Sequence, residues 1–549
     1  MKNDVPQHRL FHYFIITGLV IISYLPTFTG DFIFDDQTLV KNNNYITELH
    51  SLSSYLDQED GIPDPRDKGR IHTGYYRPLI NFTYFLDYNL WGMNAAGFRT
   101  TNLILHLLTA FILYELIFFS CGEGAAALLG AVIFAVHPVQ TEAVAVIVSR
   151  NNLLATLFIL STVFGYLRWW KSGSPLALLC SLIAFIGAMF SKEFGVMTIP
   201  ILFLAQRCLI SDHNLRREIE SYIPFLILAA LYFLIRKMAI AAPLAVPADI
   251  AMRLLFTPYL IAYNLKLIFL PSGLHSFNVG YPDSLTSPAS ITSLLLMIFI
   301  AALCRALRKE RVFLFSLGAF MLALLPVLNL FAKPSVSLIA MRWLYLPISF
   351  LSIGFAWGYL MIGAKQKRMA HALLSVIVVF FVGYSYILNL HLWHDEGTLL
   401  LQEVHHFHND RHEADYAEIM LKERNYQEAE EYFLRSLKKY PHNARTYINY
   451  SALLLDTKRP GYSVVALEKA RFLAMAHRER LDWHNNMGVA LTHMGRYDEA
   501  YQYLWQSLAM EADNHLVRRN LAALLAIQGK TVEAKQLLDE PKPLVREKH

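Results

Sequence analysis

The sequence predicts an all-α protein in which a polytopic membrane domain is followed by an α-solenoid of short helical repeats. Of its 549 residues, 55% are apolar and only 17% are charged, whereas an ordinary soluble protein carries about 25% charged residues. The mean hydropathy is +0.33, and the length exceeds what one soluble core usually supports. Residues 401–549 contain 21 basic and 21 acidic residues, so the net charge of +5 belongs to the first 400.

Apolar segments long enough to cross a bilayer recur through the first 400 residues. A span needs about 20 mainly apolar residues, because the hydrocarbon core is about 30 Å thick. We expect about 11 spans, within a range of 10 to 13, at 10–26, 100–120, 124–139, 151–168, 175–190, 194–210, 222–237, 289–306, 313–331, 341–363 and 370–390. A twelfth segment, 252–270, is apolar but contains Arg253, Asn264 and Lys266, and is interpreted as a span, a re-entrant helix or an interfacial helix.

Clusters of Lys and Arg predict the orientation of these spans, since such residues favour the cytoplasmic side. The clusters agree with one another if segment 252–270 begins and ends on the outer side, which places the N-terminus inside and everything after residue 390 outside. The predicted organisation is a membrane domain at 1–400 with a large outer loop at 28–99, a linker at 401–409, and a repeat domain at 410–549 on the outer side.

The repeat domain shows a period of 34 residues. Gly495 and Gly529 lie 34 apart, as do Ala466, Ala500 and Ala534, which is typical of tetratricopeptide repeats. About four repeats can be drawn, at 410–443, 444–480, 481–514 and 515–548. Stacked repeats form a concave surface for extended peptides or partner proteins; the alternative is a capping bundle that stabilises the membrane domain.

Two adjacent carboxylates, Asp35 and Asp36, follow the first span. Neighbouring carboxylates repel, which raises the pKa of one of them and allows it to act as a base near neutral pH. A metal site and a solvated loop are the alternatives.

Further charged and polar groups lie on the predicted outer side, where the positive-inside rule does not account for them. Arg77, in Tyr75-Tyr76-Arg77-Pro78, suits a bidentate phosphate contact or an interfacial anchor. The remaining groups are His137 with Glu142, Ser149-Arg150-Asn151, Lys192 with Glu193, and Arg342 with Tyr345. Charges held beside membrane spans are functional candidates.

Two helix faces carry polar residues for which the sequence also allows a structural role. Arg99, Asn102 and His106 are spaced by three and four residues, which favours polar packing between spans. His405, His408 and His412 share a face after the last span, and are interpreted either as a metal site or as a solvated linker.

At these groups the sequence resembles the tetratricopeptide-containing membrane glycosyltransferases of the TMTC type, which are similar to protein O-mannosyltransferases and share their GT-C fold. The resemblance covers nearly the whole chain in order. It rests on FDDQTLVKNN (34–43), YYRPLINFTYFLDYNLWGMNAAGFRTTNLILH (75–106), FAVHPVQTEAVAVIVSRNNLLA (134–155), SKEFG (191–195), YNLKLIFLP (263–271), RWLYLP (342–347) and the repeats.

The resemblance implies transfer of a mannose or other hexose from a polyprenyl-phosphate carrier to a hydroxyl, such as Ser or Thr of a protein. It implies that Asp35 or Asp36 is the catalytic base, although the pair is Asp-Asp here and Asp-Glu in O-mannosyltransferases. Arg77, Lys192 and Arg342 are then the candidates for binding the donor phosphate. His137, Glu142, Glu193 and Tyr345 are the candidates for binding sugar or acceptor.

The expected partners are the lipid-linked donor, a protein held by the repeats, and the bilayer, with no nucleic acid. The chain has no Walker loop and no Gly-x-Gly-x-x-Gly motif, which agrees with a lipid-borne donor. A divalent metal is possible, and the expected location is a bacterial inner membrane with the repeats in the periplasm. The alternative is a non-enzymatic scaffold or translocator of a lipid-linked glycan in envelope polysaccharide assembly.

Overall fold

The computed structural model describes residues 6–47, 62–63, 70–71, 75–211, 214–240, 250–274, 281–282, 284–328, 330, 338–362, 364–406 and 410–539. The predicted all-α class is confirmed in these residues. The described strands are one short antiparallel pair, β1 (Ile62–Pro63) and β2 (Arg70–Ile71). The chain divides into two compact units, Met1–Leu399 and Leu400–His549.

The first unit is a bundle of helices, and each predicted apolar segment corresponds to one or two of them. The long helices are α1 (Pro6–Tyr24), α3 (Pro78–Trp91), α4 (Ala95–Cys121), α5 (Gly124–Val136), α7 (Arg150–Ser172), α8 (Pro175–Ser191), α9 (Thr198–Leu209), α10 (Leu215–Ala239), α11 (Ile250–Phe269), α12 (Pro288–Ala306), α13 (Arg311–Leu324), α14 (Tyr345–Met361) and α15 (Ala364–His391).

Short helical turns join these helices at the places where the charged motifs occur. They are η1 (Leu25–Thr29), η2 (Gln37–Lys41), η3 (Asn44–Thr47), η4 (Pro138–Gln140), α6 (Thr141–Ala145), η5 (Ile147–Ser149), η6 (Glu193–Met197), η7 (Leu325–Val327) and η8 (Met341–Leu344). The chain therefore changes direction repeatedly at the motifs, so their side chains belong to helix ends and not to helix middles.

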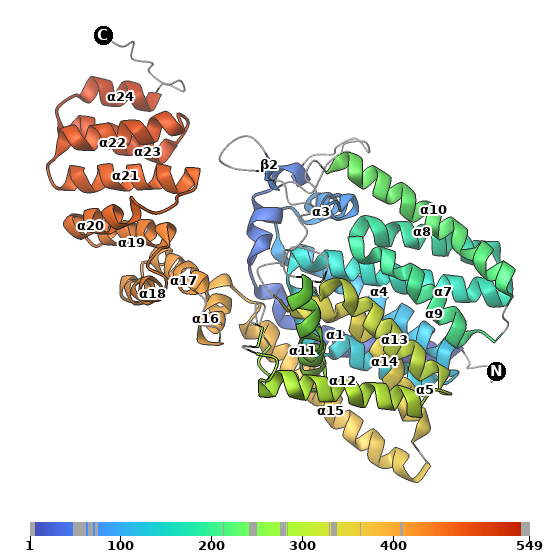
Figure 1. Ribbon diagram of the computed structural model, residues 1–549. Coiled ribbons are helices and arrows are strands. Elements are labelled where there is room, and N and C mark those ends of the chain that lie inside the picture. The colour runs from blue at the N-terminus through green and yellow to red at the C-terminus, as the bar shows by residue number, and fades with distance from the viewer. Residues whose placement is uncertain are drawn as a thin grey trace. The chain divides into compact units, whose positions relative to one another are not determined.

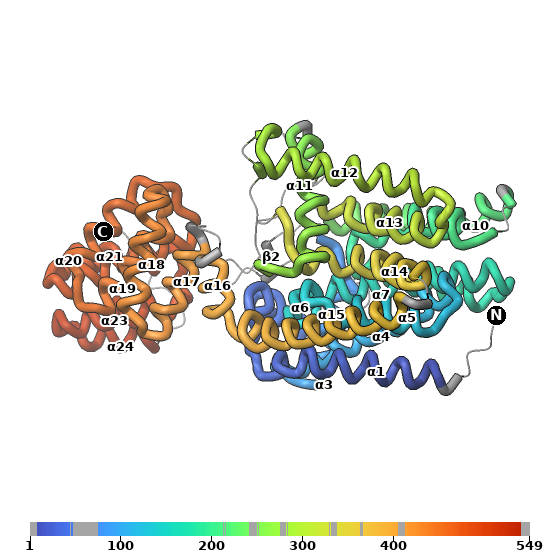
Figure 2. Tube along the Cα trace, turned by 90° about the horizontal axis from the view of Figure 1, so that it is seen from below, coloured from blue at the N-terminus to red at the C-terminus, as the bar shows by residue number. Residues whose placement is uncertain are grey.

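Helices that are distant in sequence pack against each other in the bundle. Helices α7, α8, α9 and α10 lie side by side (Figure 1). Helix α1 packs along α15, and α13 packs along α14, as Figure 2 shows. Helices α4 and α5 pack on each other, and α5 also contacts α14. The first and last helices of the unit are thus neighbours.

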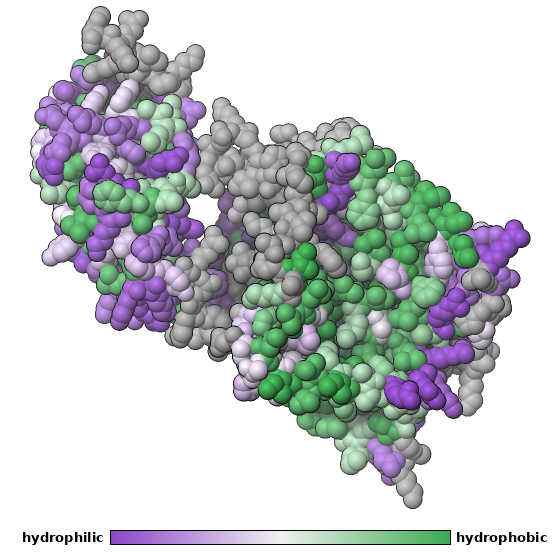
Figure 3. Space-filling view, in the orientation of Figure 1, coloured by the Kyte–Doolittle hydropathy of each residue, from purple (hydrophilic) through white to green (hydrophobic). Residues whose placement is uncertain are grey.

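The outer surface of this bundle is apolar. Large side chains such as Phe14, Phe299 and Val379 are 76%, 62% and 72% exposed, and hydrophobic residues cover much of the face shown in Figure 3. In the described residues seven helices are long and apolar enough to span a membrane, or eight if the bent pair of α5 with Pro138–Ala145 counts as one span. Helix α8 and the segment Arg311–Val327 are shorter apolar helices.

The unit is therefore part of a multi-pass membrane protein. The count of 11 spans stays a prediction, because several predicted segments form helices shorter than a full span. Segment 252–270 is helical as α11, with Pro258 inside the helix and the side chains of Arg253 and Asn264 buried. Whether α11 crosses the membrane also stays a prediction.

The second unit begins within α16 (Glu396–His406) and consists of paired amphipathic helices. Four helix pairs follow one another: α17 (Asp410–Lys422) with α18 (Tyr426–Lys439), α19 (Ala444–Asp456) with α20 (Pro460–Ala470), α21 (His477–His493) with α22 (Tyr497–Met510), and α23 (His515–Ile527) with α24 (Thr531–Asp539).

Small residues set the geometry of these pairs. Gly495 and Gly529 end their first helices with φ of 77° and 81°, a left-handed conformation that favours glycine. Gly488 lies against α22, so that a Cβ atom placed there would come within 2.5 Å of Leu504 Cγ. The glycines of the repeats therefore lie at the turns and close helix contacts of a tetratricopeptide fold.

Candidate active site

The adjacent carboxylates Asp35 and Asp36 have opposite environments. The chain leaves η1 and turns at Phe34, whose φ is 51°. After this turn Asp35 is exposed, while the side chain of Asp36 is fully buried. The pair is consequently divided between a surface group and an interior group.

The carboxylate of Asp36 is held by backbone amides from two distant segments. It accepts hydrogen bonds from Val148 N at 2.8 Å, Ile147 N at 3.2 Å and Ile33 N at 3.4 Å. Burial raises the pKa of Asp36 to about 7, although these amides and the nearby Arg99 guanidinium favour the ionised form. Asp36 thereby links the segment after η1 to η5, which precedes α7.

The guanidinium of Arg99 connects the same two regions of the chain. Arg99 is buried, and it donates to Ala145 O at 2.9 Å and to Thr27 O at 3.0 Å. It also donates to the carbonyl oxygens of Gly30 and Asp31. A buried guanidinium needs several acceptors, and here backbone carbonyls supply them. Arg99 and Asp36 together fix the position from which Asp35 projects.

The predicted polar packing on the α4 face is confirmed. Asn102 Nδ2 donates to the carbonyl oxygens of Val144 and Val146 at 3.2 and 3.3 Å. His106 is hydrogen bonded to Ala135 O at 2.9 Å and to the Tyr345 hydroxyl at 2.7 Å. This face of α4 therefore anchors α5, α6 and α14 to one another.

Glu142 and Arg342, 200 residues apart in sequence, form an ion pair. Glu142 is fully buried in α6, and it accepts a hydrogen bond from the backbone N of Arg342 at 2.7 Å and another from the Arg342 guanidinium. The Arg342 side chain is 26% exposed. It also lies close enough to Asp35 for the two charges to interact. Arg342 therefore connects the buried Glu142 with the exposed carboxylate.

A second ion pair joins Arg77 to Glu193. Arg77 Nη2 lies 3.1 Å from Glu193 Oε2, and both side chains are largely buried, at 13% and 20% exposure. The guanidinium of Arg77 also stacks on the ring of Tyr75, 4.0 Å from its centroid. These contacts hold Arg77 at the start of α3 in one orientation.

The charge of Lys192 interacts with members of both ion pairs. Its ammonium group donates to Asn152 Oδ1 at 2.6 Å and lies 4.5 Å from the ring centroid of Phe194. Its charge interacts with those of Arg77, Glu193 and Arg342. Burial, reinforced by the Arg77 and Arg342 cations, lowers the pKa of Lys192 well below its usual range.

We refer to six residues as the charged cluster, because ion pairs and charge interactions connect them into one group. They come from five separate regions of the sequence and all lie at helix ends. The members are Asp35, Arg77, Glu142, Lys192, Glu193 and Arg342. The cluster combines one exposed carboxylate with three cations, a composition suited to proton removal next to an anion.

Two other predicted site residues, His137 and Tyr345, lie inside the bundle. His137 Nε2 is hydrogen bonded to Ile268 O at 2.9 Å, and Val139 N donates to His137 Nδ1 at 3.2 Å, so that both ring nitrogens are engaged. The Tyr345 hydroxyl is bonded to His106. Their roles in binding sugar or acceptor stay predictions, and the described contacts are structural ones.

Two contributions to this region were missed from the sequence. Asn152 accepts the hydrogen bond of Lys192. The available signal was the Asn151-Asn152 pair at the start of α7, since Asn is a poor helix former and its presence there suggests a specific role. Arg150, singled out only as part of a polar turn, forms a buried ion pair with Asp87 of α3. Arg150 NεH also donates to Asn102 Oδ1 at 2.8 Å.

The described residues hold no group of three or more His, Cys, Asp or Glu side chains arranged to bind a metal. The predicted face of His405, His408 and His412 falls partly outside the described residues, because the side chains of His405 and His408 are not described. A divalent metal stays a prediction.

Fold and charged cluster together define a class: a multi-pass membrane protein with a group of acidic and basic side chains at its helix ends, followed by tetratricopeptide repeats. Comparison with known families agrees. A family model described as dolichyl-phosphate-mannose-protein mannosyltransferase matches residues 75–240, which include four of the six cluster residues. A tetratricopeptide repeat model matches residues 481–510.

Individual relatives confirm the resemblance to TMTC-type proteins. Protein O-mannosyl-transferase F38B6.6 of Caenorhabditis elegans is 29% identical over 350 residues, which are 61% of this chain and 49% of the relative. Protein O-mannosyl-transferase TMTC3 of Homo sapiens is 25% identical over 587 residues, 95% of this chain and 63% of the relative. Protein O-mannosyl-transferase TMTC4 of Homo sapiens is 26% identical over 439 residues, 67% and 58% of the two chains. The chain thus spans about half to two-thirds of the length of these relatives.

Proposed function

We propose that the protein is a membrane glycosyltransferase that moves mannose or another hexose from a polyprenyl-phosphate carrier to a hydroxyl, such as a Ser or Thr of a protein. The observation that carries this proposal is the charged cluster, in which exposed Asp35 lies within electrostatic reach of Arg342. The similarity to proteins named protein O-mannosyl-transferases supports the same reaction.

In the proposed reaction Asp35 removes the proton from the acceptor hydroxyl. The hydroxyl oxygen then forms a bond to the anomeric carbon of the sugar, while the bond from that carbon to the phosphate oxygen breaks. The base and the leaving phosphate lie on opposite sides of the sugar, so the displacement inverts the anomeric centre. Asp35 is assigned this role and not Asp36, because Asp35 is exposed and Asp36 is enclosed by backbone amides.

The cations of the charged cluster would stabilise the phosphate as it leaves. Arg342, Lys192 and Arg77 reach the cluster from η8, from the end of α8 and from the start of α3, so they present positive charge from three directions. Such fixed charges act without reorganisation when negative charge develops on the leaving group. Glu142 and Glu193 hold the two arginines in place.

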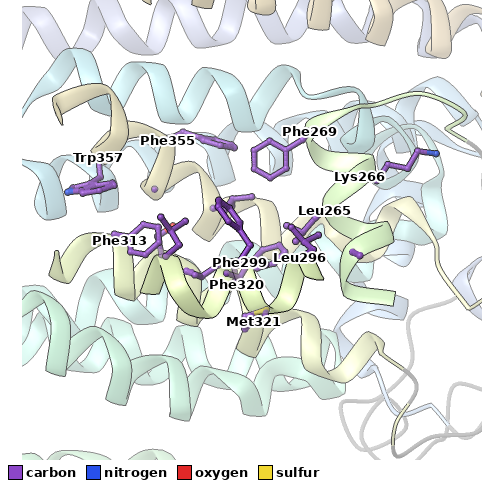
Figure 4. Close-up of a pocket in the computed structure, with 17 residues that line it drawn as sticks. Leu265, Lys266, Phe269, Leu296, Phe299, Phe313, Phe320, Met321, Phe355 and Trp357 are labelled. Carbon is purple, nitrogen blue, oxygen red and sulfur yellow. The ribbon is translucent and has the colours of Figure 1, made fainter. Parts of the chain in front are cut away.

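An apolar cavity on the same bundle supports a lipid-borne donor. The cavity has a volume of about 440 Å³ and lies between α11, α12, α13 and α14. Phe269, Phe299, Phe320 and Phe355 line it, and the amine of Lys266 points away from it (Figure 4). An isoprenoid chain is entirely apolar, and burial of such a chain stabilises binding by about 25 cal/mol per Å².

We place the charged cluster and the repeats on the outer side of a bacterial inner membrane, with the repeats in the periplasm. The distribution of Lys and Arg supports this orientation, because the basic clusters fall at the helix ends opposite to the charged cluster, for example Arg9 at the start of α1 and Lys171 at the end of α7. The repeats would hold the acceptor protein, or a partner that delivers it.

Reconstituted transfer tests the proposed function. The full chain is placed in liposomes with radiolabelled mannosyl polyprenyl phosphate and a mixture of secreted proteins as acceptors, and label in protein is measured. We expect protein-bound label that depends on the wild-type chain and disappears in an Asp35→Asn control. Absence of label with mannosyl and other hexosyl donors, together with movement of a lipid-linked glycan across the bilayer, would instead establish the translocator.

A further inference from the structure

The carboxylates around Lys192 are paired with other cations. Glu193 pairs with Arg77 and Glu142 pairs with Arg342, so each of these carboxylates already faces a cation. Within the described residues no carboxylate oxygen lies within 4.0 Å of the Lys192 ammonium group, whose hydrogen-bond acceptor is the neutral amide of Asn152. Lys192 is therefore a buried cation beside two further cations, without a carboxylate of its own.

The groups that surround Lys192 come from several elements. Arg77 comes from the segment before α3, Glu193 from η6 and Arg342 from η8, while α7 presents Asn152 and η6 also presents Phe194. Tyr232 of α10 faces Arg77 and Glu193 with a neutral hydroxyl. The Lys192 side chain itself is 6% exposed, so water offers little compensation for a charge.

We propose that Lys192 is a neutral amine when the charged cluster is empty, and that it takes up one proton from solvent when the phosphate of a polyprenyl-phosphate ligand binds. This inference rests on the proposed function and deepens it, because it assigns the ligand's anionic group to one position. A bound phosphate supplies the missing counter-charge, and the amine becomes an ammonium ion that pairs with a phosphate oxygen.

The sign of the pH dependence follows from this proton uptake. The free site has a Lys192 pKa well below its usual range, owing to burial and to the neighbouring guanidinium groups, and the bound phosphate raises that pKa. At a pH between the two pKa values, binding takes up a proton. Affinity therefore falls as the pH rises, by up to about tenfold for each pH unit.

Calorimetry of the full chain in detergent tests this inference, with a fifteen-carbon polyprenyl monophosphate as the probe. The second pKa of a phosphomonoester is about 6, so the probe keeps a constant charge between pH 7.5 and 9.5. Titration in two buffers with different ionisation enthalpies gives the number of protons taken up. We expect about one proton per bound ligand at a pH inside the window.

Lys192→Arg is the matched variant, because arginine remains charged at all these pH values. We expect Lys192→Arg to bind the probe without proton uptake and with an affinity that stays within about twofold from pH 7.5 to 9.5. Wild-type binding without proton uptake would overturn this inference and leave the proposed function standing. Proton uptake that persists in Lys192→Arg would assign it to another group, and overturns the inference as well. If neither form binds the probe, the lipid-phosphate donor of the proposed function fails, and this inference fails with it.

Discussion

Asp35 and Asp36 are neighbours in the chain, yet Asp35 is exposed near Arg342 whereas Asp36 is buried against the amides of Ile147 and Val148. Asp35 is therefore available to a ligand, whereas Asp36, the next residue, joins two loops. Substitutions at the two positions should consequently affect different properties of the protein.

Asp36→Asn should destabilise the protein. Asp36 accepts hydrogen bonds from three backbone N–H groups. An asparagine side chain keeps one acceptor oxygen but turns its NH2 group toward some of these N–H groups, which leaves buried donors without acceptors. Each such donor costs about 1–3 kcal/mol. Thermal unfolding of the purified chain in detergent measures the loss. Asp35→Asn is the control, because an exposed substitution usually changes stability by about 0.5 kcal/mol or less. Equal unfolding temperatures for the two variants would contradict the structural role of Asp36.

The stability of the wild-type chain should depend on pH through Asp36. Burial raises the pKa of Asp36 to about 7 from an ordinary value of 3.8, so the folded chain binds this proton more tightly than the unfolded chain does. The contribution is fully present below about pH 4 and is lost as the pH rises through 7. The stability difference between wild type and Asp36→Asn should therefore shrink from pH 4 to pH 7 and stay constant above. A difference that is the same at all pH values would show that Asp36 does not titrate in this range.

Removal of Arg342 should cost more than removal of the whole ion pair. Arg342→Met leaves the buried carboxylate of Glu142 without its guanidinium partner, and breaking a buried pair in this way costs about 3–5 kcal/mol. Glu142→Gln combined with Arg342→Met removes the unpaired charge and should recover part of that loss. Unfolding of the single and double variants gives a double-mutant cycle. Additive losses would indicate that the two side chains act independently.

Substitution inside the repeats should separate acceptor recognition from chemistry. In Gly488→Val the new side chain collides with Leu504 and Ala500, since a Cβ atom there lies 2.5 Å from Leu504 Cγ, and overpacking of this kind costs about 1–3 kcal/mol. We expect weaker modification of whole proteins and nearly unchanged modification of a short peptide. Gly461→Ala is the control, because a Cβ atom at that position has no atom within 4 Å apart from its chain neighbours and the backbone of its own helix. Equal losses with protein and peptide would mean that the repeats only support folding.

Much of this architecture was predictable, because it depends on local patterns. Apolar runs identify helices by their length and composition. Gly495 and Gly529, 34 residues apart, lie at equivalent turns whose left-handed conformation favours glycine. The sequence also predicts Arg77, Lys192-Glu193 and Arg342 as separate charged groups on one side of the membrane domain, but it does not predict the ion pairs among them. The helices and the glycine turns depend on information present within a few turns of the chain, whereas the common side of the charged groups depends on the order of the spans.

Other properties of the site depend on contacts between distant segments, and the sequence alone does not reveal them. The burial of Asp36 arises from η5, more than 100 residues later. His137 resembles a ligand-binding residue in sequence, but its ring nitrogens form hydrogen bonds with the carbonyl of Ile268 and the backbone N–H of Val139. Local sequence contains the same residue types in either case, so only the fold distinguishes a buried anchor from an exposed reactive group.

The central claim is that Asp35 acts as the base in sugar transfer, and the most direct measurement compares the transfer rates of wild type, Asp35→Asn and Asp35→Glu in liposomes with labelled donor at saturating concentration. General-base catalysis typically contributes about 10²–10⁴-fold. We predict that Asp35→Asn unfolds at the wild-type temperature and transfers sugar at least about a hundredfold more slowly, while Asp35→Glu retains part of the rate. A folded Asp35→Asn variant with a transfer rate close to that of wild type would contradict the account.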